Sequence, residues 1–189
     1  MKEISFAVVG AGFMGGLLAR VASDLPNTYC AGAADVDESR SAALTAQCGG
    51  RPYGDFRALL ANERPDAVLI ATPENLHCEP ALAAAAQGCH VYLEKPIATS
   101  LSDTDTIIAA CRSANVKLMV GYILRFDASY AMIESAVRSG SVGPLLSIYA
   151  RRIATIAEAR RLGGRIGPIT YIGVHDFDQM LWYHPVPVK

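Results

Sequence analysis

The sequence predicts an α/β protein with a doubly wound parallel sheet, followed by the incomplete start of an α+β domain. Three observations predict it. Short apolar runs of strand length alternate with segments of helical periodicity over residues 1–120. The connections between them are short, as in right-handed β–α–β crossovers. The first apolar run also leads directly into a glycine-rich turn that opens a helical pattern.

This turn has the spacing G-x-G-x-x-G and follows the apolar residues 4–9. In a Rossmann fold, Gly10 permits the tight turn, Gly12 admits a pyrophosphate, and Gly15 lets the helix pack on its strand. Asp35 follows Gly15 by twenty residues and ends the second apolar run, where an acid binds ribose hydroxyls. The alternative is a structural turn that binds nothing. The predicted cofactor contacts are Gly10, Gly12, Phe13, Met14, Gly15 and Asp35.

The later elements alternate regularly. Strands are predicted at residues 29–34, 51–53, 67–71, 90–93 and 117–120, in the sheet order 3-2-1-4-5-6. The helices between them have recognisable ends. Asp37 and Asp55 are predicted N-caps, and Ser100 with Asp103 forms a capping box. Glycines at 49–50 and at 88 end two of the helices.

A domain boundary is predicted near Gly121, which gives a nucleotide-binding domain over residues 1–120 and a partial α+β domain over 121–189. The second region shows a helix at 129–137, one strand at 145–150, an arginine-bearing loop with Gly163-Gly164, and a helix at 175–182. A single strand cannot form a sheet. The region therefore resembles the beginning of a domain, and its exposed apolar surface should favour association.

Composition excludes several classes of protein. The net charge of −1 gives no general attraction to nucleic acid or to anionic membranes, and no apolar run is long enough to span a bilayer. Five cysteines without a C-x-x-C spacing indicate free, buried thiols; neither a disulfide framework nor a metal site is expected. Glu3 and the glycines that follow argue against a signal peptide, so a cytoplasmic location is expected.

The predicted chemistry centres on Lys95, just beyond the fifth strand on the cofactor side of the sheet. Oxidation of an alcohol needs a hydride acceptor and a group that takes the hydroxyl proton. A positively charged nicotinamide beside Lys95 would disfavour the lysine's charged form, which suits it to that second task. A surface lysine in a loop is the alternative. His175 is the second catalytic candidate, as a residue that shares the proton or holds the substrate hydroxyl. Taken alone, the residue favours the alternative, a structural histidine or a neighbour of the helix N-cap.

Further candidates lie beside these two. Thr72, Pro73 and His77 follow the fourth strand and are expected to shape the nicotinamide end, together with Glu94 and Lys95. Arg125, just after the sixth strand, and Asp176, next to His175, are candidates for substrate binding. A solvated arginine is the alternative at position 125.

Three motifs stand out beside the nucleotide-binding domain: Glu94-Lys95-Pro96, the run from Val120 to Phe126, and Gly173-Val174-His175-Asp176-Phe177-Asp178 with Trp182. Together with that domain they resemble the Gfo/Idh/MocA oxidoreductase family. The resemblance implies a Rossmann domain followed by an α+β domain that binds substrate and forms oligomers. It implies hydride transfer between NAD and a sugar or polyol, with Lys95 and His175 in the proton relay. Asp35 resembles the acid of NAD-preferring members, so NADP is less expected.

Two departures from the family pattern qualify this expectation. Many members carry an aspartate four residues before the histidine, where this chain has Tyr171. Members are also much longer, so a truncated chain is expected. Two alternatives to a sugar or cyclitol dehydrogenase therefore stay open: a non-catalytic dinucleotide-binding fragment, and an NAD-dependent glycosidase with no net redox change. A homo-oligomer is expected in either case.

Overall fold

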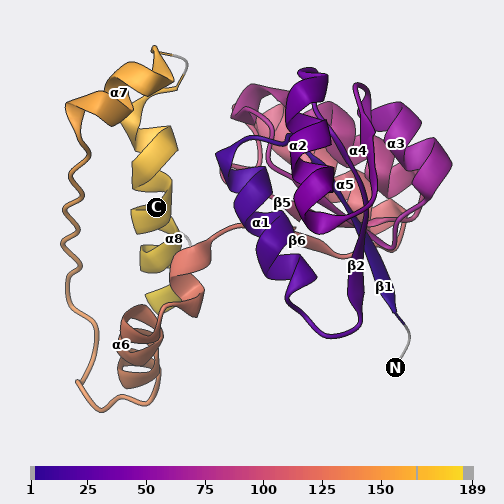
Figure 1. Cartoon of the computed structure of the whole chain (residues 1–189). Helices are drawn as coiled ribbons and strands as arrows, with labels where there is room; N and C mark the ends of the chain where they lie inside the picture. Colours follow the sequence, from indigo (N-terminus) through magenta and orange to yellow (C-terminus); the bar gives the residue numbers. More distant parts are fainter. Residues whose placement is uncertain (1–2, 165, 185–189) are drawn as a thin grey trace. The chain divides into compact units, whose positions relative to one another are not determined.

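The computed structural model describes residues 3–164 and 166–184, apart from the side chains at positions 158, 159 and 161. The chain divides into two compact units, Met1–Gly121 and Tyr122–Lys189 (Figure 1). The strands of the first unit are β1 (Ile4–Val9), β2 (Thr28–Ala34), β3 (Arg51–Tyr53), β4 (Ala67–Ile70), β5 (His90–Leu93) and β6 (Leu118–Val120). Its helices are α1 (Phe13–Ser23), α2 (Glu38–Cys48), α3 (Phe56–Glu63), the 3₁₀ turn η1 (Glu74–Leu76), α4 (Cys78–Ala86) and α5 (Leu101–Ser113).

The six strands form one sheet in the order β3-β2-β1-β4-β5-β6, with every neighbouring pair parallel. The predicted Rossmann sheet is confirmed. The strand order reverses between β1 and β4, so the carboxyl ends of these two strands flank the point where open α/β sheets bind ligands.

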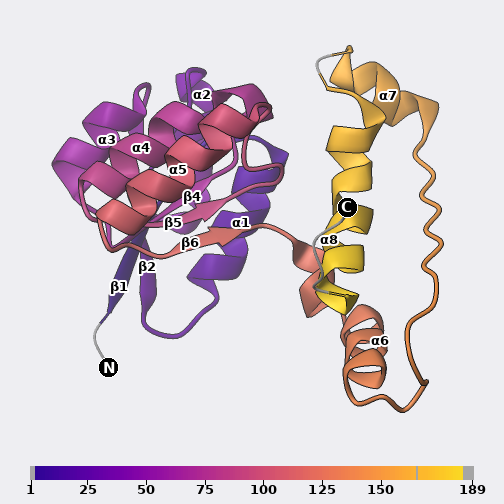
Figure 2. The ribbon, with the colours of Figure 1, turned by 180° about the vertical axis from the view of Figure 1, so that it is seen from behind.

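Helices cover both faces of the sheet, and each face has its own core. Helices α3, α4 and α5 pack on one face, where Leu59, Leu60 and Ile107 are fully buried against alternate strand residues (Figure 2). Helices α1 and α2 pack on the other, through Ala19 and Leu44. Burial of each large aliphatic side chain contributes about 1.5–3 kcal/mol. Alternate residues of a strand, such as Ala7 and Val8 of β1, enter the two different cores. Both faces of the strand are therefore apolar, which explains why a continuous apolar run predicted it.

Three helices of the first unit begin at a residue whose side chain accepts a hydrogen bond from a backbone N–H of the first turn. The side chains of Asp37, Asp55 and Ser100 accept hydrogen bonds from the first turns of α2, α3 and α5, as predicted. The Ser100 hydroxyl also donates to the carboxylate of Asp103, at 2.8 Å. Helix α1 differs, because no side chain caps its N-terminus and its first turn has no acidic residue.

The second unit is helical in its described part. It contains the 3₁₀ turn η2 (Ile123–Phe126), α6 (Ala128–Arg138), α7 (Ile156–Leu162), a π-helical turn η3 (Ile169–Gly173) and α8 (Val174–Tyr183). The predicted strand at residues 145–150 is wrong: this stretch has no regular secondary structure. A strand needs a neighbour for its hydrogen bonds, and no described segment of this unit pairs with it. The predicted loop before Gly163 instead contains α7.

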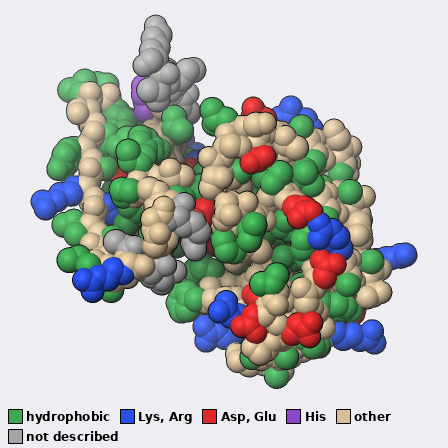
Figure 3. Space-filling model, turned by 90° about the horizontal axis from the view of Figure 1, so that it is seen from above, with side chains coloured by type: hydrophobic (Ala, Val, Ile, Leu, Met, Phe, Trp, Pro, Cys, Tyr) green, Lys and Arg blue, Asp and Glu red, His purple; other side chains and the backbone are tan. Residues whose placement is uncertain are grey.

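The second unit has no buried hydrophobic side chain among its described residues. Large apolar side chains such as Phe126, Leu146 and Tyr149 are exposed, and Figure 3 shows many hydrophobic side chains on the molecular surface.

All five cysteines are free thiols, and burial raises the pKa of the Cys30 thiol to about 11. None of the helices in the described ranges has the length and apolar character needed to cross a membrane.

Candidate functional site

Backbone hydrogen bonds carry the sheet one residue beyond its strands and bring the predicted residues to one edge. The N–H of Gly10 donates to the carbonyl of Ala34 at 2.8 Å, and the N–H of Ala71 donates to that of Val9 at 2.8 Å. The N–H of Glu94 donates to the carbonyl of Ile70 at 2.9 Å. The glycine-rich turn, Asp35, the loop after β4 and the Glu94-Lys95-Pro96 loop therefore lie along the same carboxyl edge.

Two glycines of the turn are required by the fold itself. Gly10 has φ +92°, and a Cβ there would lie 2.7 Å from the backbone of Ala71 and of Thr72. A Cβ at Gly15 would lie 1.9 Å from the carbonyl oxygen of Gly10. The first glycine thus lets the loop after β4 approach the turn, and the second lets α1 pack on β1.

Gly12 is different, because the protein itself leaves room there. Its φ is −75°, and a Cβ at this position would meet no atom within 4 Å. It is also the N-cap of α1, whose uncapped N–H groups carry partial positive charge. Phe13 is 83% exposed beside it, and Met14 is half-buried. An open, uncapped helix N-terminus at this edge fits the diphosphate of a dinucleotide.

Asp35 fixes the glycine-rich turn from the neighbouring strand. One carboxylate oxygen accepts the N–H of Ala11 at 2.8 Å, and the other accepts the N–H of Asp37 at 2.9 Å. A carboxylate has about four acceptor positions, so Asp35 retains capacity for ribose hydroxyls. Asp37 caps α2 as predicted, and its pKa is lowered chiefly by the hydrogen bond from the Ser39 hydroxyl.

The loops after β4 and β5 present buried polar atoms at this edge. Thr72 Oγ1 is buried and has no hydrogen-bond partner among the described residues. Burial raises the pKa of Glu94, partly opposed by the backbone N–H and the charge of Lys95 and by a hydrogen bond with the Tyr92 side chain. Lys95 is half-buried and joins Pro96 through a cis peptide bond. A buried hydroxyl without a partner, on the loop next to one with a half-buried lysine, fits a polar ligand such as a nicotinamide carboxamide.

His77 was predicted to shape the same end of the cofactor, and the structure shows that it is not exposed to a ligand. Its ring is 1% exposed and faces backbone carbonyls on both sides. Any influence of His77 on a cofactor must therefore act through the loops that it touches.

The second unit holds the remaining candidates. His175 lies half-buried in the first turn of α8, and Tyr171 lies in the π-helical turn before it. The guanidinium of Arg125 binds the carboxylate of Asp178 through three contacts of 2.6–3.1 Å. Asp176 accepts from Arg152 at 2.8 and 3.1 Å. Both predicted substrate residues are thus engaged in ion pairs within their own unit.

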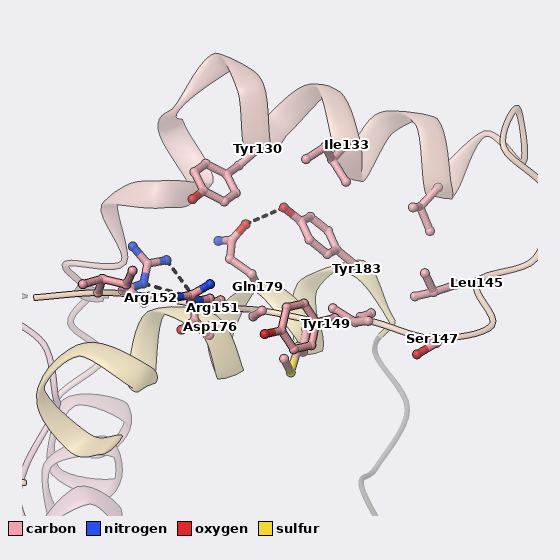
Figure 4. Close-up of a pocket in the computed structure, with 15 residues that line it drawn as sticks. Tyr130, Ile133, Leu145, Ser147, Tyr149, Arg151, Arg152, Asp176, Gln179 and Tyr183 are labelled. Carbon is pink, nitrogen blue, oxygen red and sulfur yellow. Dashed lines mark hydrogen bonds and ion pairs between the residues drawn. The ribbon is translucent and has the colours of Figure 1, made fainter. Parts of the chain in front are cut away.

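A groove of about 530 Å³ runs between α6, the extended residues 145–153 and α8 (Figure 4). Arg152 and Asp176 meet on one wall, and the Tyr183 hydroxyl donates to Gln179 Oε1 at 2.8 Å. Sequence reasoning did not single out Arg152, Gln179 or the buried Asp178 as partners. Asp176 and Gln179 are three residues apart in α8 and therefore lie on one face of the helix. This spacing is the feature of the sequence that could have predicted that both line the groove.

Known proteins resemble this chain over most of its length. A family profile described as "Oxidoreductase family, NAD-binding Rossmann fold" (Gfo/Idh/MocA) matches residues 4–122. The 2,7-anhydro-N-acetylneuraminate hydratase of Escherichia coli (strain K12) is 31% identical over 180 residues, 93% of this chain and 48% of that protein. The myo-inositol 2-dehydrogenase of Thermotoga maritima is 31% identical over 176 residues, 90% of this chain and 52% of that protein.

The solved structures agree with these relatives. Apo scyllo-inositol dehydrogenase from Lactobacillus casei superposes with a TM-score of 0.89 at 25% identity, over 96% of this chain and 55% of that chain. This chain thus spans about half the length of the curated relatives it matches. The predicted resemblance and the predicted cofactor, NAD, are confirmed at the level of the family. The chain belongs to the Gfo/Idh/MocA oxidoreductase family, which has an NAD-binding Rossmann fold.

Proposed function

We propose that this chain binds NAD(H) along the carboxyl edge of its sheet and is an oxidoreductase acting on a secondary alcohol of a sugar or cyclitol. The observation that carries the proposal is the uncapped N-terminus of α1 at Gly12, open to a diphosphate and next to the carboxylate of Asp35. The inositol dehydrogenases among the relatives support the substrate class.

The two halves of the sheet divide the cofactor between them, as in other Rossmann folds. Gly12, Phe13 and Met14 would hold the diphosphate, and Asp35 would accept the ribose hydroxyls of the adenosine half. The negative charge of Asp35 disfavours the additional phosphate of NADP. Thr72, Pro73, Glu94 and Lys95 would receive the nicotinamide half, where the buried Thr72 hydroxyl has no partner among the described residues.

The bound nicotinamide would supply the hydride acceptor, and the protein must supply the proton acceptor. We assign that role to Lys95, and we propose His175 as a second residue of the proton relay. Replacement of Lys95 by alanine should abolish NAD reduction with myo- or scyllo-inositol and leave the dissociation constant for NADH within about threefold. Full activity of this variant would remove Lys95 from the mechanism.

We also propose that Arg125 and Asp176 bind the substrate. The ion pairs use Nε and Nη2 of Arg125 and Oδ1 of Asp176, so Arg125 Nη1 and Asp176 Oδ2 could contact a substrate with both pairs intact. The two residues can also serve the site by fixing η2 and the start of α8. We further propose a homo-oligomer, supported by the exposed apolar side chains of the second unit and testable by light scattering.

Binding of NADH tests the central proposal. Gly12→Ala introduces a methyl group where the folded protein has space, so the variant should fold while its methyl group obstructs the diphosphate. We expect NADH affinity to fall at least tenfold, roughly 1.4 kcal/mol, in a calorimetric titration. Gly16→Ala is the matched control, since its Cβ is also unobstructed and lies within α1. Equal NADH affinity of Gly12→Ala and the parent would contradict the proposal.

The hydratase among the relatives supports a second candidate function. A hydratase adds or removes water without net oxidation, so any NAD reduced in one step would have to be reoxidised in a later step of the same cycle. This is the same signature as the redox-neutral glycosidase. Product formation without accumulation of NADH would select this function over a dehydrogenase. NADH binding without turnover on either class of substrate would indicate a dinucleotide-binding fragment.

A further inference from the structure

His77 links the two loops that follow β4 and β5. Its Nδ1 lies 2.9 Å from the carbonyl oxygen of Pro96 and 3.2 Å from that of Ile97. Its Nε2 lies 3.0 Å from the carbonyl oxygen of Thr72. The ring is 1% exposed. It therefore spans the space between the loops as a rigid planar spacer that solvent does not reach.

The donor inventory of the ring makes this arrangement specific for histidine. Carbonyl oxygens only accept hydrogen bonds, and a neutral imidazole donates from one nitrogen while the cation donates from both. Burial lowers the pKa of His77, opposed by the three carbonyls and by the charge of Glu74. Each ring nitrogen lies within hydrogen-bond distance of a carbonyl oxygen of one loop, so a protonated ring would donate to both loops and a neutral ring to one of them. In both states the ring fills the space between the loops.

These loops carry the atoms that the proposed function assigns to the nicotinamide half. Thr72, whose carbonyl oxygen faces the ring, also holds an unsatisfied buried hydroxyl. Lys95 and Glu94 directly precede Pro96, whose carbonyl oxygen faces the other side of the ring. No comparable side chain is needed at the adenosine half, where Asp35 already fixes the turn.

We propose that His77 is a positioning residue of the nicotinamide end, which holds the Thr72 loop and the Glu94-Lys95-Pro96 loop at the separation that a nicotinamide requires. The inference rests on the proposed function, because it assumes that NAD(H) occupies this edge. It assigns His77 no contact with the cofactor. The effect of losing the ring should therefore be confined to ligands that carry the nicotinamide.

The test compares NADH with ADP-ribose, which keeps the adenosine, the diphosphate and a ribose but lacks the nicotinamide. In the full chain, His77→Leu should weaken NADH binding about tenfold or more and leave ADP-ribose binding within about twofold. His90→Leu is the matched control. It makes the same replacement at the opposite end of β5, where the ring accepts a hydrogen bond from the Lys117 N–H at 3.2 Å.

The outcomes separate a positioning role from a structural one. Equal loss of both ligands, or no loss of either, would overturn the inference while leaving the proposed function intact. If the unmodified chain binds neither ligand, the proposed function fails and this inference fails with it. Should His77→Leu not fold, as judged by circular dichroism, His77→Gln retains a donor at this position. That variant should show the same selective loss of NADH at smaller amplitude, and a parental affinity ratio would refute the assignment.

Discussion

The contact between α1 and β1 at Gly15 allows a quantitative prediction. A methyl group at this position would lie 1.9 Å from the carbonyl oxygen of Gly10 and 3.2 Å from Cγ1 of Val8. The carbonyl is backbone at the end of a buried strand, so it cannot rotate away as a flexible side chain would. Overpacking of this kind costs about 3 kcal/mol at the upper end of its usual range. Replacing a helical glycine by alanine returns about 1 kcal/mol.

Gly15→Ala should therefore destabilise the chain by about 2 kcal/mol. For a chain of this size that lowers the melting temperature by about 4–8 °C. Gly16→Ala is the matched variant, because its Cβ meets no atom within 4 Å and only the helix-propensity gain remains. It should raise the melting temperature by about 2–4 °C. Thermal unfolding followed by far-ultraviolet circular dichroism measures both, and a Gly15→Ala chain as stable as Gly16→Ala would refute the packing argument.

Three further predictions follow from the described contacts. Asp35→Ser removes the charge that opposes a 2′-phosphate, so the affinity for NADPH relative to NADH should rise about tenfold or more; an unchanged ratio in parallel titrations would show that Asp35 does not meet the ribose. Burial raises the pKa of Glu94 above its ordinary 4.5, so the native state holds a proton that the unfolded state releases, and stability falls as pH rises through that window. Glu94→Gln should remove this loss of stability at higher pH. The melting temperature of the variant minus that of the parent should therefore be larger at neutral than at acidic pH. A difference that does not change with pH would contradict the prediction. Asp178→Asn takes the ionic partner from Arg125, whose guanidinium lies 5.6 Å from the Trp182 ring centroid. We expect a loss of about 1–2 kcal/mol and a shifted emission of Trp182, the single tryptophan; unchanged emission would show that the ion pair does not position the ring.

The fold of the first unit could be predicted because its signals are local. Most of the strands are short apolar runs, β3 (Arg51–Tyr53) being the exception. Each of α2, α3 and α5 begins at a side chain that bonds its own first turn. The strand predicted at residues 145–150 failed because strand formation depends on a partner elsewhere in the chain. Helix α7 was missed because the glycine pair at 163–164 suggested a loop. Those glycines adopt positive φ and in fact form the turn that follows the helix.

In the candidate site, too, the sequence predicted residues whose partners lie in adjacent strands and missed a contact between distant segments. Gly10, Gly15 and Asp35 could be assigned from spacing, since their partners lie at predictable ends of adjacent strands. The partner of Arg125 lies 53 residues away, and nothing in the spacing of Arg125 indicates that its guanidinium is taken.

A polar residue after a parallel strand can face a ligand or satisfy the protein's own backbone, and both choices have the same sequence pattern. Thr72 and His77 illustrate the two outcomes within one loop: the threonine hydroxyl is buried without a partner, and the histidine ring faces carbonyls on both sides. Hydrogen-bond accounting therefore distinguishes them where sequence cannot. The Thr72 hydroxyl is assigned to the ligand, and the His77 ring to the loops that hold the ligand. Loss of the His77 ring should therefore weaken NADH binding and spare ADP-ribose binding, although the ring touches neither ligand.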